Sequence, residues 1–388
     1  MQLEKGGPGG RAPLPSLLYR GAGEAGEPED GGKREMVTEP WTIGRRYRGY
    51  IRAKWAVIFA TLLATILLML YAVVAGSANL SVADVVRTLL GKGDARMNVI
   101  IWNIRLPRVL AAVVAGMGLS VAGAVAQSVL RNPLASPFTL GITQGAAFGA
   151  AVAIFFLGAG GVRNMEHVFI NNPYVVVISA FTGALATTLV VIFLAKMFRA
   201  TPEALVLSGV ALSSLFQAGT MLIQYFADDV TVASIVFWTF GDIGRATWRD
   251  LGIMTVVVLA ATLYFMHNRW NYNALDSGEE TAKALGVDVE RVRLSGMFVT
   301  ALVTAVIVAF LGIIGFIGLI GPHIMRRLIG GDHRYLIPAS TVFGGFILLA
   351  SDTVGRVILS PVILPVGIVT SALGAPVFLY VLMRGYRR

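Results

Sequence analysis

The sequence predicts an all-α membrane protein with about ten transmembrane helices. Of its 388 residues, 56% are hydrophobic and 14% are charged, whereas soluble domains are about 45–50% apolar and about 25% charged. Ten apolar segments can be drawn, each near the ~20 residues that cross a bilayer. If the chain crosses the membrane at every segment, alternate loops lie on the same side. Lysine and arginine are concentrated in the loops of one side, which is the pattern of cytoplasmic loops.

The ten segments follow a polar tail. Residues 1–54 are rich in Gly, Pro and Glu, lack the apolar core of a signal peptide and end in a basic run, so we expect a disordered cytoplasmic tail. A translation start at Met36 is an open alternative. Residues 55–388 form the predicted transmembrane domain, with segments at residues 55–75, 106–130, 138–158, 173–196, 204–226, 250–267, 295–311, 313–329, 336–357 and 366–384. The seventh and eighth nearly abut, which leaves nine spans as an alternative; with ten, both termini are cytoplasmic.

A weak internal repeat relates the two halves of the chain. Residues 105–108 open a long segment that ends at residues 132–134, and residues 291–294 open a Gly-rich stretch that ends at residues 321–323. Five spans separate the two copies, and an odd number inverts the second copy in the membrane. Because inverted repeats are typical of transporters, the sequence predicts an inverted five-plus-five arrangement.

Small residues predict close helix packing in two places. Gly141, Gly145 and Gly149 recur every four residues in the third segment, and Gly321 precedes Pro322 in the eighth. Helices in lipid associate through close backbone contact, which small residues permit. We expect a packing role for these glycines and, at Gly321 and Pro322, a broken or mobile helix.

The longest internal polar stretch lies between the sixth and seventh segments, at residues 268–295, and is called the polar island below. Its centre predicts two short helical pieces joined at Gly286, with Ala282 and Leu285 on one face of the first piece and charges on the other. An ordinary solvated loop and a docking site for a soluble partner both fit this pattern.

Several kinds of chemistry are excluded by the composition. The chain has no cysteine and its four histidines show no metal-ligand spacing, so we expect no metal site and no cofactor. It carries neither a catalytic motif nor a P-loop, so we expect no enzyme activity and no ATP hydrolysis of its own. The net charge of +10 is assigned to the flanks of membrane spans rather than to nucleic acid. Energy for transport must then come from a partner or from an ion gradient.

An ion-coupled secondary transporter is the alternative from a different class. Such proteins carry ionisable groups within their spans, and Asp352 is the best candidate here. Arg356 follows it one helical turn later, where it can neutralise the carboxylate. The sequence leaves open whether Asp352 is a coupling site or one half of an internal pair.

Several long motifs occur in order across residues 55–388 and resemble those of the FecCD-type permeases. They are IRLPR at 104–108, RNPLASP at 131–137, LGI at 140–142, GFIGLIGPHI at 315–324 and LPVGIVT at 364–370. Members of this family are the membrane subunits of binding-protein-dependent ABC importers for iron complexes, haem and vitamin B12. The resemblance implies ten spans, a homodimer with the passage between its subunits, two ABC ATPase subunits in the cytoplasm and an extracytoplasmic solute-binding protein.

The same resemblance assigns roles to individual residues. It places Glu279, Ala282, Leu285 and Gly286 in coupling helices that dock the ATPase, Arg105, Arg108 and Arg356 where the binding protein docks, and Asn132, Pro133, Leu134 and Thr201 at the cytoplasmic gate. Arginine suits docking because its planar fork pairs with carboxylates. Anchoring at the membrane interface, or an internal pair with Asp352, would also explain these arginines. Ile363 departs from the family, which often has Glu there.

We therefore expect a permease subunit in the cell membrane that imports an iron complex, a siderophore or haem, with energy from a partner ATPase. Import of vitamin B12 by the same architecture is the first alternative. An ion-coupled transporter and a purely structural membrane scaffold are the alternatives from other classes. The cargo is not readable from the chain, because a permease passage needs only size and a neutral lining.

Overall fold

The computed structural model describes residues 40–76, 80–164, 167–170, 172–197 and 201–385. The chain divides into two units, Met1–Tyr47 and Arg48–Arg388. In the first unit the described residues are the beginning of helix α1 (Pro40–Val74). Residues 40–54 are therefore helical, where we predicted part of a disordered tail. Residues 1–39, including Met36, lie outside the described part.

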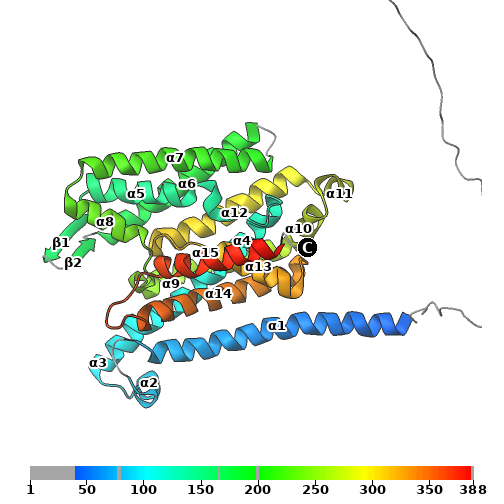
Figure 1. Cartoon of the computed structure of the whole chain (residues 1–388). Coiled ribbons are helices and arrows are strands. Elements are labelled where there is room, and N and C mark those ends of the chain that lie inside the picture. Colours follow the sequence, from blue (N-terminus) through cyan, green and yellow to red (C-terminus); the bar gives the residue numbers. More distant parts are fainter. Residues whose placement is uncertain (1–39, 77–79, 165–166, 171, 198–200, 386–388) are drawn as a thin grey trace, which may run out of the picture. The chain divides into compact units, whose positions relative to one another are not determined.

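Helices make up most of the second unit (Figure 1). After α1 come α2 (Val82–Leu89), α3 (Ala95–Asn98), a π-helical turn (Val99–Arg105), α4 (Leu106–Val129), a 3₁₀ turn (Pro137–Leu140), α5 (Ile142–Phe156), α6 (Pro173–Met197), α7 (Pro202–Phe226), α8 (Asp229–Thr239), a 3₁₀ turn (Ile243–Arg245), α9 (Trp248–His267), α10 (Arg269–Asp276), α11 (Glu279–Ala284), α12 (Val289–Leu311), α13 (Ile317–Ile329), α14 (His333–Val357) and α15 (Val366–Gly385). Each of the ten predicted segments contains a helix, in the predicted order.

Seven helices of the described chain are long and apolar enough to cross a membrane: Arg48–Val74, Ala95–Val129, α6, α7, α9, α12 and α14. The shorter α5, α13 and α15 occupy the other three predicted segments. The seventh and eighth segments are separate helices, because Gly312 and Phe316 have positive φ values of 77° and 65° and interrupt the helical conformation between α12 and α13. With 13 residues, α13 rises about 20 Å, less than the ~30 Å of a hydrocarbon layer.

One small sheet was not predicted. Strands β1 (Gly160–Asn164) and β2 (His167–Ile170) pair antiparallel, with Gly160 opposite Ile170. Both strands contact α8. A two-stranded hairpin is marginal by itself and needs a neighbour to pack on, so its presence depends on α8 and is not visible in the local hydropathy pattern.

Helix α4 occupies the centre of the bundle, where it contacts α9, α12, α13 and α14. All of its residues from Gly118 to Val129 are buried. A Cβ atom at Gly116 would collide with the Gly344 carbonyl of α14, and one at Gly123 would collide with the Gly318 carbonyl of α13. Backbones that lie this close gain the van der Waals contact that holds helices together in lipid.

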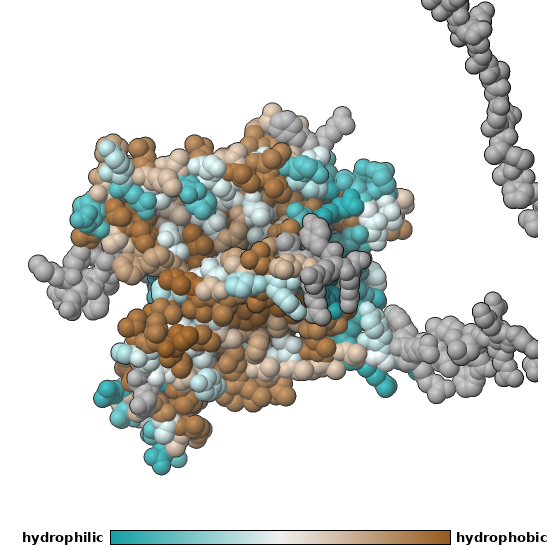
Figure 2. Space-filling model, viewed as in Figure 1, coloured by the Kyte–Doolittle hydropathy of each residue, from teal (hydrophilic) through white to brown (hydrophobic). Residues whose placement is uncertain are grey.

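The surface of the bundle separates apolar flanks from polar ends. Figure 2 shows hydrophobic residues along the flanks and a group of hydrophilic residues around α11. Large apolar side chains are exposed on several helices, among them Leu70 of α1, Leu222 of α7 and Leu379 of α15. Such a surface fits a hydrocarbon solvent rather than water, and the protein is a multi-pass membrane protein.

Candidate functional site

Three arginines lie close together where α4 begins: Arg105, Arg108 and Arg356. Arg108 Nε and Nη2 donate to Asp352 Oδ1 at 3.0 and 2.8 Å, and Arg356 Nε donates to Asp352 Oδ2 at 3.0 Å. The Asp352 side chain is 0% exposed, and the three arginines are buried. A buried carboxylate needs charged, hydrogen-bonded partners of this kind.

Two of these arginines, Arg105 and Arg356, also donate hydrogen bonds to carbonyls at the last turn of α1. Arg105 Nη1 donates to the carbonyls of Val73 and Val74, both at 2.7 Å. Arg356 Nη1 donates to two more carbonyls near that turn, at 3.0 and 2.9 Å. The last carbonyls of a helix have no partner within it and carry the negative end of its dipole, so cationic donors stabilise them.

The structure thus brings the three predicted docking arginines together and gives each an internal partner. The pair of Asp352 and Arg356, left open by the sequence, is internal, and Arg108 joins it. Asp352 therefore has the surroundings of a structural ion pair. Docking of a partner protein on these arginines stays a prediction.

The polar island is built differently from the predicted pair of helices. It contains α10 and α11, and the chain then turns at Gly286, with φ of 81°, into the long α12. Ala282 is buried and Leu285 is 70% exposed, so the prediction that they share one face was wrong. The reason is that α11 ends at Ala284, and Leu285 already belongs to the turn.

Asp276, the last residue of α10, joins three other helices. Its carboxylate accepts a hydrogen bond from Ser128 Oγ of α4 at 2.8 Å, lies 3.2 Å from Arg326 Nη1 of α13 and lies 3.1 Å from His333 Nε2 of α14. Burial acts to raise the pKa of this carboxyl. The hydrogen bond and charge of His333, the charge of Arg326 and the hydrogen bond of Ser128 outweigh burial and hold the pKa of Asp276 below its ordinary value.

Glu279, the first residue of α11, is also tied to the bundle. Its Oε2 atom lies 3.3 Å from Nη2 of Arg293 in α12. The same guanidinium donates through Nε to the carbonyl of Val129, the last residue of α4, at 3.1 Å. The Arg293 side chain is 2% exposed and that of Glu279 is 33% exposed. One buried arginine therefore connects α11 to the end of α4.

The predicted gate loop follows directly after α4. The Asn132 side chain accepts a hydrogen bond from the Leu134 backbone at 2.9 Å and fixes the turn at Pro133. A cavity of about 310 Å³ opens beside the loop, and its lining residues are Gln127, Arg131, Asn132, Pro133, Asp276 and Arg326. Thr201 caps the N-terminus of α7 through a hydrogen bond from Ala204 and is not among the lining residues, so the four predicted gate residues do not share this cavity.

The predicted packing glycines lie in close contact with neighbouring helices. A Cβ at Gly145 or Gly149 would collide with α6, and one at Gly321 would collide with Ser120 of α4. Gly141 has a φ of 75° and lies against the Gly209 carbonyl of α7. Pro322 lies within α13, which runs on from Ile317 to Ile329, so the expected break falls before α13 rather than at Pro322.

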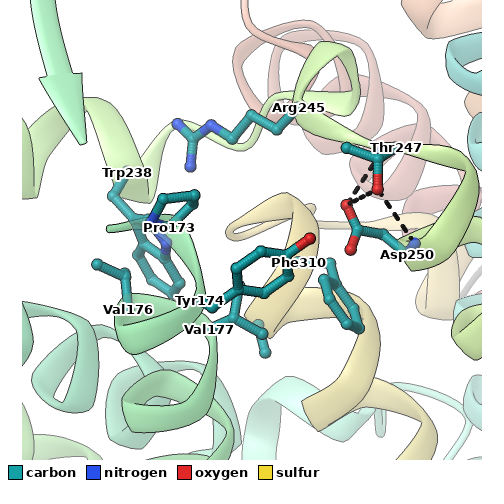
Figure 3. A pocket seen from close by; sticks show the side chains of 10 residues that line it. Pro173, Tyr174, Val176, Val177, Trp238, Arg245, Thr247, Asp250 and Phe310 are labelled. Atoms are coloured by element: carbon teal, nitrogen blue, oxygen red, sulfur yellow. Dashed lines mark hydrogen bonds between the residues drawn. The ribbon is translucent and has the colours of Figure 1, made fainter. Parts of the chain in front are cut away.

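A second cavity, of about 90 Å³, lies between α6, α8 and the start of α9 (Figure 3). The Asp250 carboxylate on its wall accepts hydrogen bonds from the Thr247 backbone and hydroxyl at 3.0 and 2.8 Å. The bond from the Thr247 backbone and a second one, from the Asp250 backbone N–H to the Thr247 hydroxyl at 3.3 Å, form the capping box of α9, which satisfies free N–H groups at the start of a helix. Asp250 thus has a structural task at this cavity.

Three residues of the site were missed by sequence reasoning: Ser128, Asp276 and Arg293. Arg293 carries the only signal of the three, as a charged residue at the edge of an apolar segment and within the internal repeat. In the part of the chain that the structure describes, no group of three or more His, Cys, Asp or Glu side chains is arranged to hold a metal ion.

Comparisons with known proteins agree on one family. The profile of the FecCD transport family matches residues 63–384. A protein of Methanocaldococcus jannaschii described as an ABC transporter permease is 56% identical over 348 residues, 89% of this chain and 99% of that protein. The hemin transport system permease of Yersinia pestis is 35% identical over 83% of this chain and 95% of its own length. The vitamin B12 import system permease of Vibrio cholerae is 34% identical over 74% and 83%.

The fold agrees with a solved structure as well. An inward-facing ABC transporter described as being of the metal-chelate type superimposes with a TM-score of 0.72 and 31% identity. The match covers 85% of this chain and 99% of that chain. Both the sequence and the arrangement of helices are therefore similar to those of ABC permeases.

Proposed function

Because the chain belongs to the FecCD transport family and is the permease subunit of an ABC importer of the metal-chelate type, we propose that it carries an iron complex, a siderophore or haem, into the cytoplasm. It resides in the cell membrane with both termini in the cytoplasm. A second copy of the chain, two ABC ATPase subunits and an extracytoplasmic binding protein complete the importer. The ATPase subunits hydrolyse the ATP.

The polar island carries the proposal of a coupled ATPase. Of the six residues of α11, only Ala282 is buried, and Leu285 beside it is 70% exposed. A short, lightly held helix with an exposed leucine suits insertion into a groove of a soluble partner. A rigid push on α11 then reaches the bundle through Glu279 and Asp276, which turns ATP-driven closure into movement of helices.

The cavity beside the gate loop supports an anionic cargo. Arg131 and Arg326 line it with Asp276 as the one acidic residue, so its lining carries a net positive charge. Arginine attracts carboxylates and binds them with two parallel hydrogen bonds. Haem and many ferric chelates carry carboxylates, whereas corrinoids present mostly amides. Relatives named for hemin and for vitamin B12 are almost equally similar to this chain, so the cavity favours the iron complex where identity does not.

Transport assays test this proposal directly. In a strain that lacks the gene, uptake of labelled ferric siderophore, haemin and cobalamin is measured with and without the restored gene. A matched strain carries the restored gene with an ATPase partner that cannot hydrolyse ATP. We expect gene- and ATPase-dependent uptake of an iron complex alone. Uptake of cobalamin alone would keep the importer and refute the cargo. Uptake that continues with the inactive ATPase would contradict ATP coupling.

A further inference from the structure

Two neighbouring residues at the end of α4 are held by the polar island. Ser128 Oγ donates to Asp276 at 2.8 Å, and the Val129 carbonyl accepts from Arg293 at 3.1 Å. Asp276 ends α10, and Arg293 passes the connection on to Glu279 of α11 at 3.3 Å. The last turn of α4 is therefore held by two hydrogen bonds to the polar island.

The Arg293 contact is suited to carrying force. Its guanidinium is planar, so hydrogen bonds to Val129 and Glu279 at different nitrogens set the distance between α4 and α11 with little freedom. The Arg293 side chain is 2% exposed, so loss of a hydrogen-bond partner would leave its charge buried and less well compensated. Glu279 and Ala282 are the points where α11 meets the bundle, and Glu280 and Lys283 pair with each other on its exposed side.

The last turn of α4 is joined rigidly to the gate loop. Leu130 and Asn132 each donate a backbone hydrogen bond to the last turns of α4, at 3.0 Å. Arg131 between them has a φ of 47°, a left-handed conformation that is unfavourable for residues other than glycine. A movement of the last turn of α4 therefore moves Asn132 and Pro133 with it instead of being absorbed in a flexible link.

We propose that Arg293 is a positioning residue that transmits displacement of α11 to the gate loop at residues 131–134, with Ser128 and Asp276 as the second connection. The inference rests on the proposed function, because it assumes that a partner ATPase moves α11. It goes further by naming the atoms through which that movement reaches the gate. In this role Arg293 holds the backbone of α4 through the Val129 carbonyl, and Ser128 holds it through its own hydroxyl on Asp276.

The test uses the whole importer, with its ATPase and binding protein, in proteoliposomes. The chain has no cysteine, so Leu134→Cys supplies one thiol on the gate loop of each copy of the chain, and its labelling by a membrane-impermeant maleimide reports the position of the gate. Arg293→Met keeps an unbranched stem but removes the donors. Arg291→Met, two residues earlier on the exposed side of α12, is the matched control, and Ser128→Ala is a milder variant of the second connection.

We expect ATP to change the labelling rate in the Leu134→Cys background and in the Arg291→Met control. Arg293→Met should keep ATP hydrolysis within about twofold while transport per ATP and the ATP-dependent change in labelling fall about tenfold, the size of a lost coupling between sites. Ser128→Ala should fall between the two. Unchanged labelling and transport in Arg293→Met would overturn the inference, and so would a parallel loss of hydrolysis, transport and protein stability, which indicates a structural role. Failure of the unmodified importer to respond to ATP would instead count against the proposed function.

Discussion

Arg108 and Asp352 lie 244 positions apart in the chain and meet in a buried pair, with Arg108 Nη2 2.8 Å from Asp352 Oδ1. Arg356 completes the arrangement from the next turn of α14. The carboxylate thereby joins α4 to α14 at the end of the bundle where Arg105 and Arg356 bind the last carbonyls of α1. Its two guanidinium partners explain why a lone carboxylate can lie inside an apolar segment.

Replacing Asp352 tests this relationship. Asp352→Asn leaves two buried guanidinium groups without their counter-ion, and we expect the protein to lose about 3–5 kcal/mol of stability. Thermal unfolding in detergent measures the loss, with Asp229→Asn at the exposed start of α8 as the control. A variant that unfolds like the unmodified protein but transports poorly would instead assign Asp352 a role in transport.

Arg105 separates a helix-capping role from a docking role. Arg105→Lys keeps the charge but loses the Nη1 donor that reaches two carbonyls of α1, so we expect a loss of about 1–3 kcal/mol. Arg87→Lys, on the exposed side of α2, is the control for stability. Affinity for the binding protein is measured on the same samples. If affinity falls and stability does not, Arg105 is a docking residue and its cap on α1 contributes little.

The crossing of α4 and α13 depends on Gly123. A methyl group there would collide with the Gly318 carbonyl, and a backbone atom cannot move aside as a flexible side chain can. We expect Gly123→Ala to cost at least about 1–3 kcal/mol and to lower the yield of folded protein. Gly252→Ala on α9, where an added Cβ has nothing within 4 Å, should be tolerated. Equal stability of the two variants would show that the helices do not approach this closely.

Leu285 offers a test of ATPase docking that leaves the fold alone. The side chain is 70% exposed, so Leu285→Ser should leave thermal stability unchanged. If it enters a groove of the ATPase, stimulation of ATP hydrolysis by the loaded binding protein should fall about tenfold, as for a contact at the centre of an interface. Leu90→Ser is the control, because Leu90 is also 70% exposed but follows α2. Equal stimulation in both variants would exclude Leu285 from the docking surface.

Asp332 predicts a pH dependence of stability. It accepts hydrogen bonds from the Arg334 side chain at 2.6 and 2.8 Å and from Asn273 at 3.1 Å. Burial acts to raise the pKa of Asp332, but these bonds and the Arg334 charge lower it to about 2. A pKa below that of the unfolded chain, about 4, means that the stabilisation is complete above pH ~5 and is lost as the pH falls from about 4 to about 2.

The measurement compares thermal unfolding of the unmodified protein and Asp332→Asn between pH 2 and pH 6. The difference in unfolding temperature should be constant above pH ~5 and should shrink below pH ~4, because only the unmodified protein has this carboxylate to protonate. Glu290→Gln, an exposed site at the start of α12, corrects for removal of a carboxylate in general. A difference that stays constant down to pH 2 would contradict the lowered pKa of Asp332.

Hydropathy and spacing were sufficient for the helices and for the position of the polar island. The inverted repeat stays a prediction, as do the roles of the gate residues. The local pattern failed where a contact decided the outcome. Leu285 and Ala282 fit one helical face by spacing, but the turn at Gly286 ends α11 first. The β1–β2 hairpin likewise depends on α8, and the start of α1 at Pro40 carries a helix into a segment that is polar by composition.

The sequence by itself determined the membrane class, ten helical segments and their order, because a bilayer requires about 20 apolar residues whose backbone bonds are satisfied within the helix. Only the tertiary structure decided which charges meet. Arg293 reaches a carbonyl 164 positions away at Val129, and Arg105 reaches the end of α1. Their acceptors are backbone atoms that every residue possesses, so no side-chain pattern can reveal them before the helices cross.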